Sequence, residues 1–541
     1  MMYLLKTTYF LLICCQIINT TSSAQLFPYT ITVKPLTADS LVSVHSAIAG
    51  KSGDKILMIG GRLDGLHKRQ PFAAFDIENR NLNAIVINVK TKKCISRAID
   101  SLESYIYDQL VASNHQCYQL GNKLYACGGY GYSASLDEHH TFDRMLVFDI
   151  DKTIAAIENG TTITNCFQHV QNPIFQVTGG NLHMLNNQFY LIGGHVFEGR
   201  YNPNGPEFGP GFNQIYSNQI RVFELNSTNN LLQVVEIKTY TDTVNLHRRD
   251  YNLVAARDKY NHEYLDIYSG VFQYGMDLPY MNAVRVDTGG YHVLPHFAQY
   301  YNHYSCPVIP LYSTKQRSQH HIFLGGIAHY YDSIGIPVQN NNVPHVKTIC
   351  NVVTNERGSK TEYLLESSLD EYYTAVAQFI KAENIASYQN GVIQMDSLIG
   401  DTILTGYIIG GIKSDMQNTF WETEGEFSRP YNTLREVYLI KNEKAIINPN
   451  LQSVNTLQLQ VNPNIKTETI EIYVSTDHTM DVYISLSDES GKLLDRYSFM
   501  QTPAGRNKLE IKRPGIAKGA VYILQLNAGK YEAIQKLNIE M

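Results

Sequence analysis

The sequence predicts an all-β protein made of six similar units of four strands, followed by a smaller β-sandwich. Three observations support this prediction. An apolar run that ends in a glycine pair recurs between residues 56 and 412. Short apolar and β-branched runs flank each copy, and Gly-Asn or Asn-Asn turns separate several of them. Residues 457–541 alternate apolar and polar positions with a period of two, which is typical of strands with one buried face.

The glycine pairs define the repeated unit. The clearest copy is Phe189–His195, which reads FYLIGGH, and a weaker copy has Ser269 in place of the first glycine. A single four-stranded sheet buries little by itself, so each unit must pack against its neighbours. We therefore expect a six-bladed β-propeller over residues 25–445, in which glycine lets backbones approach closely near the axis. The intact pairs lie at 60–61, 128–129, 193–194, 325–326 and 410–411.

Each unit is expected to contain a first strand, a turn, the strand that ends at the glycine pair, a polar loop and a third strand. A more polar fourth strand, such as 231–237, follows in some units. The early strand 29–33 is expected to join the last sheet and close the ring. First strands are expected at 46–49, 117–120, 182–185 and 252–255. Third strands are expected at 73–77, 145–150, 219–225, 282–286, 346–350 and 435–440.

Two inserts interrupt this pattern. The segment 202–211 is rich in glycine and proline and predicts a long loop. The segment 367–387 places apolar residues at helical spacing, with Asp370 and Glu371 early and Lys381 late. This pattern predicts a helix between the fifth and sixth units.

The glycine pair, followed by a loop and a strand such as 146–149 (LVFD), resembles the kelch repeat, whose copies form β-propellers. The resemblance covers about residues 29–444. It departs from the family in two respects. The glycine pairs lie 56 to 85 residues apart, more than the kelch period of roughly 50. The tryptophan that usually follows the third strand is missing from every unit.

A second domain is expected after a linker at 446–456, where the composition turns to Asn and Ser. Residues 457–541 predict a small Ig-like β-sandwich. This tail resembles the C-terminal sorting domain of cargo of the type IX (Por) secretion system of Bacteroidetes. The resemblance implies that the outer-membrane secretion machinery is a partner, whereas an adhesive or spacer domain is the alternative. The matching segments are 461–464, 488–493, 518–526 and 535–539.

The N-terminus predicts export. Lys6, an apolar run at 9–18 and the small residues 22–24 are typical of a signal peptide over residues 1–24. No later stretch reaches the roughly 18 apolar residues of a membrane span, so we expect no transmembrane segment. We therefore expect the protein to be secreted or to lie on the outer cell surface. The net charge of −6 gives no electrostatic reason to expect nucleic acid as a partner. Six cysteines remain after the signal peptide, and their irregular spacing does not indicate a disulfide scaffold.

One mouth of a ring of this kind is built from residues that precede the first strands and from the loops after the glycine pairs. In this chain these positions are rich in His, Arg and Tyr, which suit a sugar, a carboxylate or an anionic glycan. A polar channel lining that binds no ligand would have the same composition. The candidate ligand-binding residues are His45, Arg62, His67, Arg69, His115, Tyr130, His195, Arg200, Arg248, Arg249, Tyr304 and Tyr388.

No complete catalytic set is found in the sequence. GxSxG, HExxH and P-loop motifs are missing, and the single tryptophan, Trp421, excludes the tryptophan-bearing Asp-box repeats of sialidases. A copper oxidase would need a Tyr-Cys pair and two His ligands that the sequence does not place. Adjacent histidines on a strand, as at 139–140 and 320–321, point to opposite faces, so we expect no metal and no cofactor.

The predicted function is a secreted or cell-surface module that binds glycan or protein at the mouth of the ring. A kelch-type sugar mutarotase or epimerase is the alternative, with Glu198 and either Arg200 or His195 as acid and base. A third possibility is a scaffold whose outer loops bind protein around an inert channel.

Overall fold

β-Strands are the main elements of the described part of the chain, and helices are few and short. The computed structural model describes residues 27–442 and 458–538, except 39–40, 70–72, 100–101, 230, 295, 303–304, 334–335, 464–468, 477–478, 489–491, 504, 513–520 and 529–530. The predicted signal peptide and linker lie outside the described residues. None of the helices in the described ranges has the length and apolar character to traverse a bilayer.

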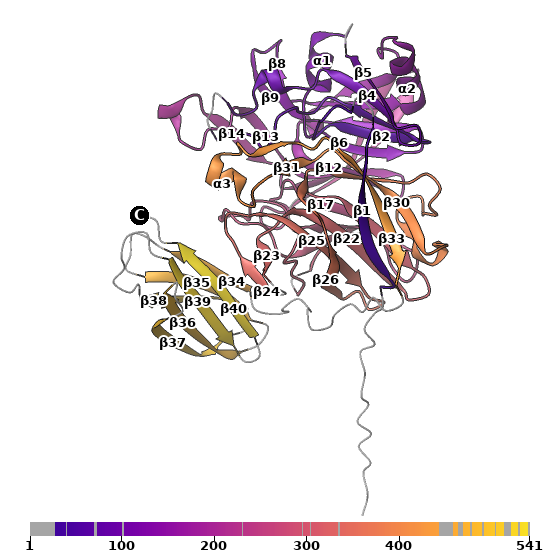
Figure 1. Cartoon of the computed structure of the whole chain (residues 1–541). Helices are drawn as coiled ribbons and strands as arrows, with labels where there is room; N and C mark the ends of the chain where they lie inside the picture. Colours follow the sequence, from indigo (N-terminus) through magenta and orange to yellow (C-terminus); the bar gives the residue numbers. More distant parts are fainter. Residues whose placement is uncertain are drawn as a thin grey trace, which may run out of the picture.

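Within the described residues, six sheets each contain four antiparallel strands, which follow one another in sequence order in the first five sheets (Figure 1). The first has β2 (Ile48–Ser52), β3 (Lys55–Ile59), β4 (Asn83–Asn88) and β5 (Lys93–Ala98). The second has β6 (Gln116–Leu120), β7 (Lys123–Cys127), β10 (Arg144–Asp149) and β11 (Phe167–Gln171). The third has β12 (Thr178–Leu185), β13 (Gln188–Gly199), β15 (Gln219–Thr228) and β16 (Leu231–Thr241), and the fourth has β17 (Asn252–Arg257), β18 (Glu263–Tyr268), β19 (Ala283–Asp287) and β20 (Gly290–Leu294).

The sixth sheet joins the two ends of this region. The fifth sheet has β21 (Val308–Ser313), β22 (Ser318–Ile327), β25 (His345–Thr354) and β26 (Lys360–Ser368). The sixth has β28 (Gln378–Lys381), β30 (Thr402–Ile409), β33 (Leu434–Lys441) and β1 (Tyr29–Leu36). The N-terminal strand pairs with β33 along its whole length, with Tyr29 opposite Lys441. The expectation that the early strand joins the last sheet is confirmed.

Shorter elements connect these strands. The helices are α1 (Ser104–Leu110), α2 (Ile150–Asn159) and α3 (Thr419–Thr423), with 3-10 turns η1 (Ile77–Asn79), η2 (Pro173–Phe175), η3 (Pro206–Phe208) and η4 (Met395–Ser397). The short strands are β8 (Tyr130–Ser133), β9 (Glu138–Thr141), β14 (Phe212–Tyr216), β23 (Tyr330–Ser333), β24 (Ile336–Gln339), β27 (Tyr372–Ala375), β29 (Ile393–Gln394), β31 (Ile412–Ser414) and β32 (Ser428–Pro430).

All six pairs of the repeated signature adopt one backbone conformation. The first residue of each pair has φ between 56° and 66°, and the second has φ between 76° and 97°. Ser269 follows the same rule with φ 60°, so this weaker copy is a true member of the series. Space is also limiting, because a Cβ on Gly128 would lie 1.9 Å from the Val177 carbonyl oxygen of the next sheet. Glycine at position 128 therefore meets both a conformational and a steric requirement.

Hydrogen bonds link the six sheets in a closed series. They connect the segments that precede the first strands, which we call the lead-in segments. Each segment bonds to the next one along the chain, and the last bonds back to the first sheet through Gln378. The bonds are Asn114 N to Ser46 O (3.0 Å), Thr178 Oγ1 to Asn114 O (3.2 Å), Asp250 N to Gly179 O (2.8 Å), Ser305 N to Asp250 O (3.2 Å), Val376 N to Ser305 O (2.9 Å) and Gln378 Nε2 to Ala47 O (3.0 Å).

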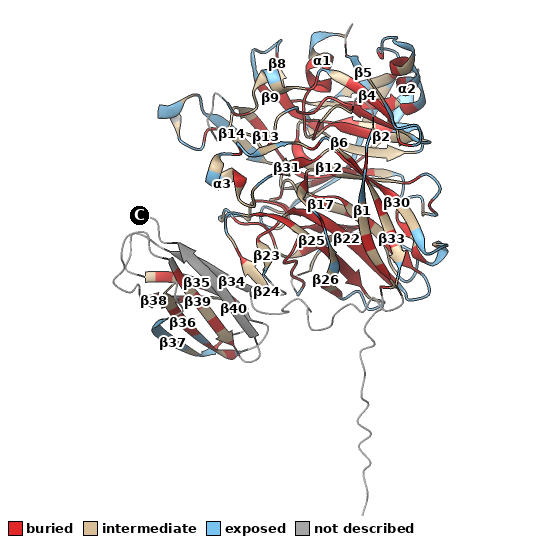
Figure 2. Ribbon diagram, viewed as in Figure 1, coloured by how far each residue is buried: buried red, intermediate tan, exposed pale blue. Residues whose placement is uncertain are grey.

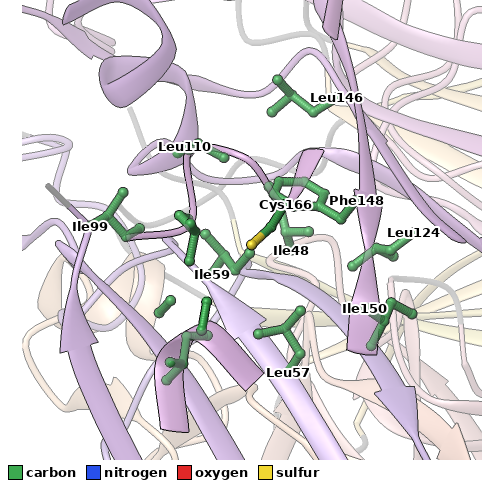
Figure 3. Close-up of a cluster of buried hydrophobic side chains, with 14 of the residues drawn as sticks. Ile48, Leu57, Ile59, Ile99, Leu110, Leu124, Leu146, Phe148, Ile150 and Cys166 are labelled. Atoms are coloured by element: carbon green, nitrogen blue, oxygen red, sulfur yellow. The ribbon is translucent and has the colours of Figure 1, made fainter. Parts of the chain in front are cut away.

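The apolar core of the six sheets is divided into clusters that lie between consecutive sheets. Six buried clusters each contain residues of two consecutive sheets, and one of these clusters joins the sixth sheet to the first. Figure 2 shows the buried residues concentrated along the strands of these sheets. Figure 3 shows one cluster, in which Ile48 and Leu57 of the first sheet lie near Leu124 and Phe148 of the second. Each sheet is thus stabilised by burial against two neighbours.

The C-terminal strands form two sheets around a separate core. One sheet contains β34 (Gln458–Pro463), β35 (Thr469–Thr476) and β38 (Gly505–Lys512). The other contains β36 (Met480–Asp488), β37 (Leu493–Thr502), β39 (Val521–Ala528) and β40 (Tyr531–Asn538), and β24 joins its edge. Side chains from both sheets, such as Ile472 and Leu524, share one buried cluster. This shared core explains the alternation of apolar and polar positions that was predicted for residues 457–541.

Two predicted elements are wrong. The segment 367–387 forms β27 and β28 instead of a helix, and Val376 between them has φ 55°, which no helix accommodates. Its β-branched and aromatic residues pack between sheets, and this tertiary packing overrides the helical spacing. The expected third strand at 73–77 is also wrong. Phe75 has φ 52°, Asp76 caps η1 through its hydrogen bond to Glu78 N (3.2 Å), and β4 takes the place of that strand.

Candidate functional site

The loops that follow the glycine pairs gather at one end of the six sheets, which we call the loop end. The strands β8, β9 and β14 and the helix α3 all belong to these loops, and Figure 1 shows them on one side of the molecule. A shallow polar depression beside α2 lies elsewhere, next to the turn between β2 and β3. The loop end is therefore the place to look for the predicted mouth.

Six aromatic rings at the loop end contact one another in a circle, which we call the aromatic circle. Its members come from loops of the first, second and third sheets. The circle closes because each ring touches two others. The centroid distances are His67–Phe75 4.9 Å, Phe75–Tyr130 5.0 Å, Tyr130–Phe197 5.2 Å, Phe197–Phe212 4.9 Å, Phe212–Tyr201 5.6 Å and Tyr201–His67 4.9 Å.

Phe75 is central to this arrangement and was not among the candidate residues. Its ring lies 5.6 Å from the Arg62 guanidinium, and its carbonyl oxygen accepts a hydrogen bond from His139 Nε2 at 2.8 Å. His139 and His140 do point to opposite faces, as expected, because His140 bonds to Glu198 instead. A positive φ is unusual for an aromatic residue and would single out Phe75 as a site residue. No feature of the sequence reveals that conformation, so sequence reasoning could not find it.

Two candidates of the first unit form a polar group with Asp64 near the aromatic circle. Arg62 makes two hydrogen bonds to Asp64, Nε to Oδ1 at 2.7 Å and Nη2 to Oδ2 at 2.6 Å. His45 Nε2 lies 4.0 Å from the same carboxylate. Burial lowers the pKa of His45 to about 4, with a smaller contribution from Arg62. The imidazole is therefore neutral at physiological pH.

The other candidate histidines are also neutral; His195 is buried, and His67 and His115 are partly buried. Burial lowers the pKa of His67 to about 4 and that of His115 to about 4, and it holds the pKa of His195 well below its usual value. His195 Nδ1 accepts a hydrogen bond from Gln214 Nε2 at 2.5 Å, and His115 Nε2 contacts the Gln109 carbonyl oxygen at 2.8 Å. These rings supply shape and hydrogen bonds at the loop end, and no positive charge.

Arg69 is partly buried and lies beside this layer. Its guanidinium carbon lies 4.7 Å from the centroid of Trp421 and 5.9 Å from that of Phe420, both on α3. Among the described residues, no ion pair includes Arg69, and its Nε has no hydrogen-bond partner. Trp421 is 45% exposed. Arg69 and Trp421 therefore present a cation beside an open aromatic face.

The two adjacent arginines of the fourth unit differ in role. Arg249 faces the loop end, where its Nε donates to the Tyr216 hydroxyl at 3.2 Å and its guanidinium lies 5.3 Å from the Phe272 ring. Arg248 is 1% exposed, donates to the Ser269 carbonyl oxygen at 2.8 Å and stacks on a tyrosine. Arg248 thus holds the lead-in segment to the glycine pair of its own sheet, away from any ligand that the loop end could reach.

Three of the candidate ligand-binding residues remain, Arg200, Tyr388 and Tyr304. Arg200 acts electrostatically on Tyr130, whose hydroxyl donates to the Gly199 carbonyl oxygen. The placement of Tyr388 at the mouth is wrong. It lies at the opposite end of the sheets, where its ring stacks 4.1 Å from the Arg257 guanidinium and its hydroxyl lies 3.4 Å from Thr314 Oγ1. Tyr304 lies outside the described residues.

Exposed apolar side chains also concentrate at the loop end. They come from the loops after the glycine pairs of the first, third, fourth and sixth sheets, and one of them, Phe212, is itself a member of the aromatic circle. Sequence reasoning missed them because loops carry no periodicity that marks an exposed ring. They are Leu63, Phe208, Phe212, Ile215, Tyr274, Trp421 and Phe427, between 36% and 63% exposed.

Comparison with known proteins adds little to this picture. No protein-family model and no curated protein matches the chain. A solved structure described as that of YjhT is 11% identical over 71% of this chain and 94% of that chain, with a TM-score of 0.41. An exo-1,5-alpha-L-arabinanase from a bovine ruminal metagenomic library is 8% identical over 74% and 95%, with a TM-score of 0.26. An arabinoxylan arabinofuranohydrolase of glycoside hydrolase family 43 from Bacillus subtilis is 8% identical over 80% and 96%, with a TM-score of 0.23.

These structures are β-propeller-like. At such low TM-scores they carry no argument about the activity of this chain. The strand order, the hydrogen bonds between sheets and the apolar clusters of this chain define its fold.

Proposed function

We propose that the protein is a six-bladed, kelch-like β-propeller that binds glycan at its loop end. The observation that carries the proposal is the platform of Arg69 and Trp421, surrounded by exposed rings on the neighbouring loops. Aromatic rings bind the apolar faces of sugars, and an uncompensated guanidinium can bind a hydroxyl or a carboxylate. The aromatic circle beside them, in which Tyr130 and Phe197 are buried, would fix these loops in place, as a binding site requires.

The closed series of hydrogen bonds supports the ring. So do the six apolar clusters between consecutive sheets, one of which joins the sixth sheet to the first. The long spacing of the glycine pairs agrees with large loops at the loop end. A kelch-like ring with enlarged loops accounts for both features.

A glycan array tests this function. The secreted chain is expected to bind a restricted set of glycans, and Trp421→Ala and Arg69→Ala are each expected to weaken binding about tenfold or more. Tyr260→Ala is the matched control, because Tyr260 is 68% exposed and lies in the turn between β17 and β18 at the other end of the sheets. An array without binding, or equal binding by Trp421→Ala and Tyr260→Ala, would contradict the proposal.

A sugar mutarotase or epimerase is the second candidate. The observation in its favour is the partly buried pair of His140 and Glu198, whose Nδ1 and Oε2 atoms lie 2.7 Å apart at the loop end. Burial alone would lower the pKa of His140, but the hydrogen bond and charge of Glu198 outweigh it and raise the pKa. His195, one of the two predicted partners of Glu198, is instead bonded to Gln214. Exchange of sugar anomers, followed by NMR, should fall in Glu198→Gln if this reading is right.

Export completes the proposal. We infer that residues 1–24 direct secretion and that the C-terminal strands form an Ig-like sorting domain read by the type IX machinery. The separate apolar core of these strands supports a domain that can be recognised and removed independently. Mass measurement of the secreted protein tests this: loss of residues up to 24 and of about 90 C-terminal residues is expected. An intact C-terminus on secreted protein would overturn removal of the tail.

A further inference from the structure

Three metal-ligating side chains meet at the loop end between the second and third sheets. They are Glu138 and His140 on β9 and Glu198 near the end of β13. One ligand atom from each lies within 4.8 Å of the other two. We propose that these three residues form a binding site for a divalent transition-metal ion of the zinc type. The site goes beyond glycan binding and does not depend on it.

The strand geometry explains why the three groups converge. Residues two apart on a strand point to the same face, so Glu138 and His140 share a side while His139 between them points away. Glu198 reaches the same side from the adjacent strand, and its Oε2 lies 2.7 Å from His140 Nδ1. The sequence-based expectation of no metal considered only adjacent histidines, and it missed a histidine that combines with carboxylates two residues away and on another strand.

The two strands that carry the ligands are fixed to one another. The Thr141 hydroxyl donates to the Phe197 carbonyl oxygen at 2.7 Å and accepts from the Phe197 amide at 2.8 Å. Gln176 Nε2 donates to Glu198 Oε1 at 3.3 Å and so orients the carboxylate from outside the site. Such supporting hydrogen bonds are typical of built metal sites.

The charge and the donor set define the ion. The charged groups with the largest effect on His140 are three carboxylates, those of Glu198, Asp143 and Glu138. One imidazole and two carboxylates suit Zn²⁺ or Mn²⁺ better than Mg²⁺, which prefers oxygen ligands alone. Ligand atoms of a tetrahedral zinc ion lie about 3.3 Å apart, given bonds of about 2.0–2.1 Å. The exposed Glu138 must therefore move inward, and the His140–Glu198 contact must open slightly.

Calorimetry with Zn²⁺ and the full chain tests the site. Wild-type protein is expected to bind one equivalent saturably, and His140→Gln and Glu138→Gln are each expected to weaken binding at least tenfold. His262→Gln is the matched control, because His262 Nδ1 also contacts a carboxylate, Asp258 Oδ2, at 3.2 Å, but has no third ligand among the described residues. All variants keep the six cysteines, so a difference between them cannot come from thiol binding.

A second measurement guards against a folding defect. Zn²⁺ should raise the unfolding temperature of wild type and His262→Gln, and should not raise that of Glu138→Gln. Glu138 is exposed, so its replacement leaves the fold intact. Wild-type protein without saturable binding, or His140→Gln binding as tightly as wild type, would overturn the proposal. Trp421→Ala is expected to keep the zinc site while it loses glycan, so the two proposals can fail independently.

Discussion

Lys360 and Asp266 form a fully buried ion pair between the fourth and fifth sheets. Lys360 Nζ lies 2.5 Å from Asp266 Oδ2, 2.8 Å from the Tyr268 hydroxyl and 2.7 Å from Thr354 Oγ1. Burial lowers the pKa of Lys360 to about 8, although Asp266 opposes this shift. The partners of Lys360 thus keep it in its charged form. Loss of the lysine would leave the buried carboxylate of Asp266 without its nearest cation.

Lys360→Met is therefore expected to destabilise the protein by about 3–5 kcal/mol, because among the described residues Asp266 would keep a single ion-pair partner, Arg285, whose Nε is 3.6 Å away, and a hydrogen bond from the Tyr268 hydroxyl at 3.2 Å. The shift in the urea unfolding midpoint measures this loss. Arg429→Met is the control: Arg429 pairs with Asp415 on the surface, and its removal should cost less than about 1 kcal/mol. Equal effects of the two substitutions would contradict the prediction.

Glu362 gives a pH-dependent prediction. It is 1% exposed and accepts hydrogen bonds from the amides of Tyr300 and Tyr301, and burial raises its pKa to about 8. The folded state therefore holds a proton that the unfolded state releases near its ordinary pKa of 4.5. Between these values stability falls as pH rises, by up to about 1.4 kcal/mol per pH unit.

Glu362→Gln should remove this loss. Relative to wild type, the variant should have a higher unfolding midpoint at pH 8 than at pH 5. Glu366→Gln, on the exposed face of the same strand, should shift the midpoint equally at both pH values. Parallel pH profiles for Glu362→Gln and wild type would show that the carboxyl is ionised in the folded state.

Individual residues of the site were predictable only where the repeat fixed their place. Arg62, Tyr130 and His195 follow glycine pairs, and the structure places all three at the loop end. Tyr388 was misplaced because no glycine pair marks the segment before β28. Phe75 and Tyr201 were missed because their ring contacts cross between loops of different sheets, and such contacts leave no spacing in the sequence.

At the scale of the element, the glycine pair gives the sharpest test. Gly128→Ala would combine positive φ with a Cβ 1.9 Å from the Val177 carbonyl oxygen. Gly121→Ala has a similar φ of 56° but meets nothing within 4 Å, so it reports the backbone strain alone, about 1–2 kcal/mol. Thermal unfolding should show a clearly larger loss for Gly128→Ala. Similar losses would mean that the neighbouring sheet yields to the extra carbon.

Strands were easier to predict than helices in this chain. The strands next to the glycine pairs were found because turns and apolar runs mark their limits. The helix α2 was missed although its signals are present: Asp149 accepts from Lys152 N at 3.1 Å, and Gly160 ends the helix with φ 68°. The apolar run up to Ile150 was assigned entirely to the preceding strand. Conversely, the helical spacing in 367–387 arises from residues that face different sheets.

At the scale of the whole molecule, β1 should control stability. Its side chains Tyr29, Ile31 and Leu36 are buried against neighbouring sheets. A chain that begins at residue 37 would lose this burial, at roughly 1.5–3 kcal/mol for each large apolar side chain, and would expose the edge of β33. Its unfolding temperature should fall well below that of a chain that begins at residue 27. Equal unfolding temperatures would show that the ring does not need its N-terminal strand.

The pairing of β1 with β33 also brings the two ends of this region together, since Asn442 N donates to the Pro28 carbonyl oxygen at 2.8 Å. The starting point of the chain is then arbitrary with respect to its sheets. A circular permutant of residues 28–442 that joins these ends by a short peptide and opens at the exposed turn between Gly53 and Asp54 would retain every strand pairing within the six sheets, with β2 now at its C-terminal end.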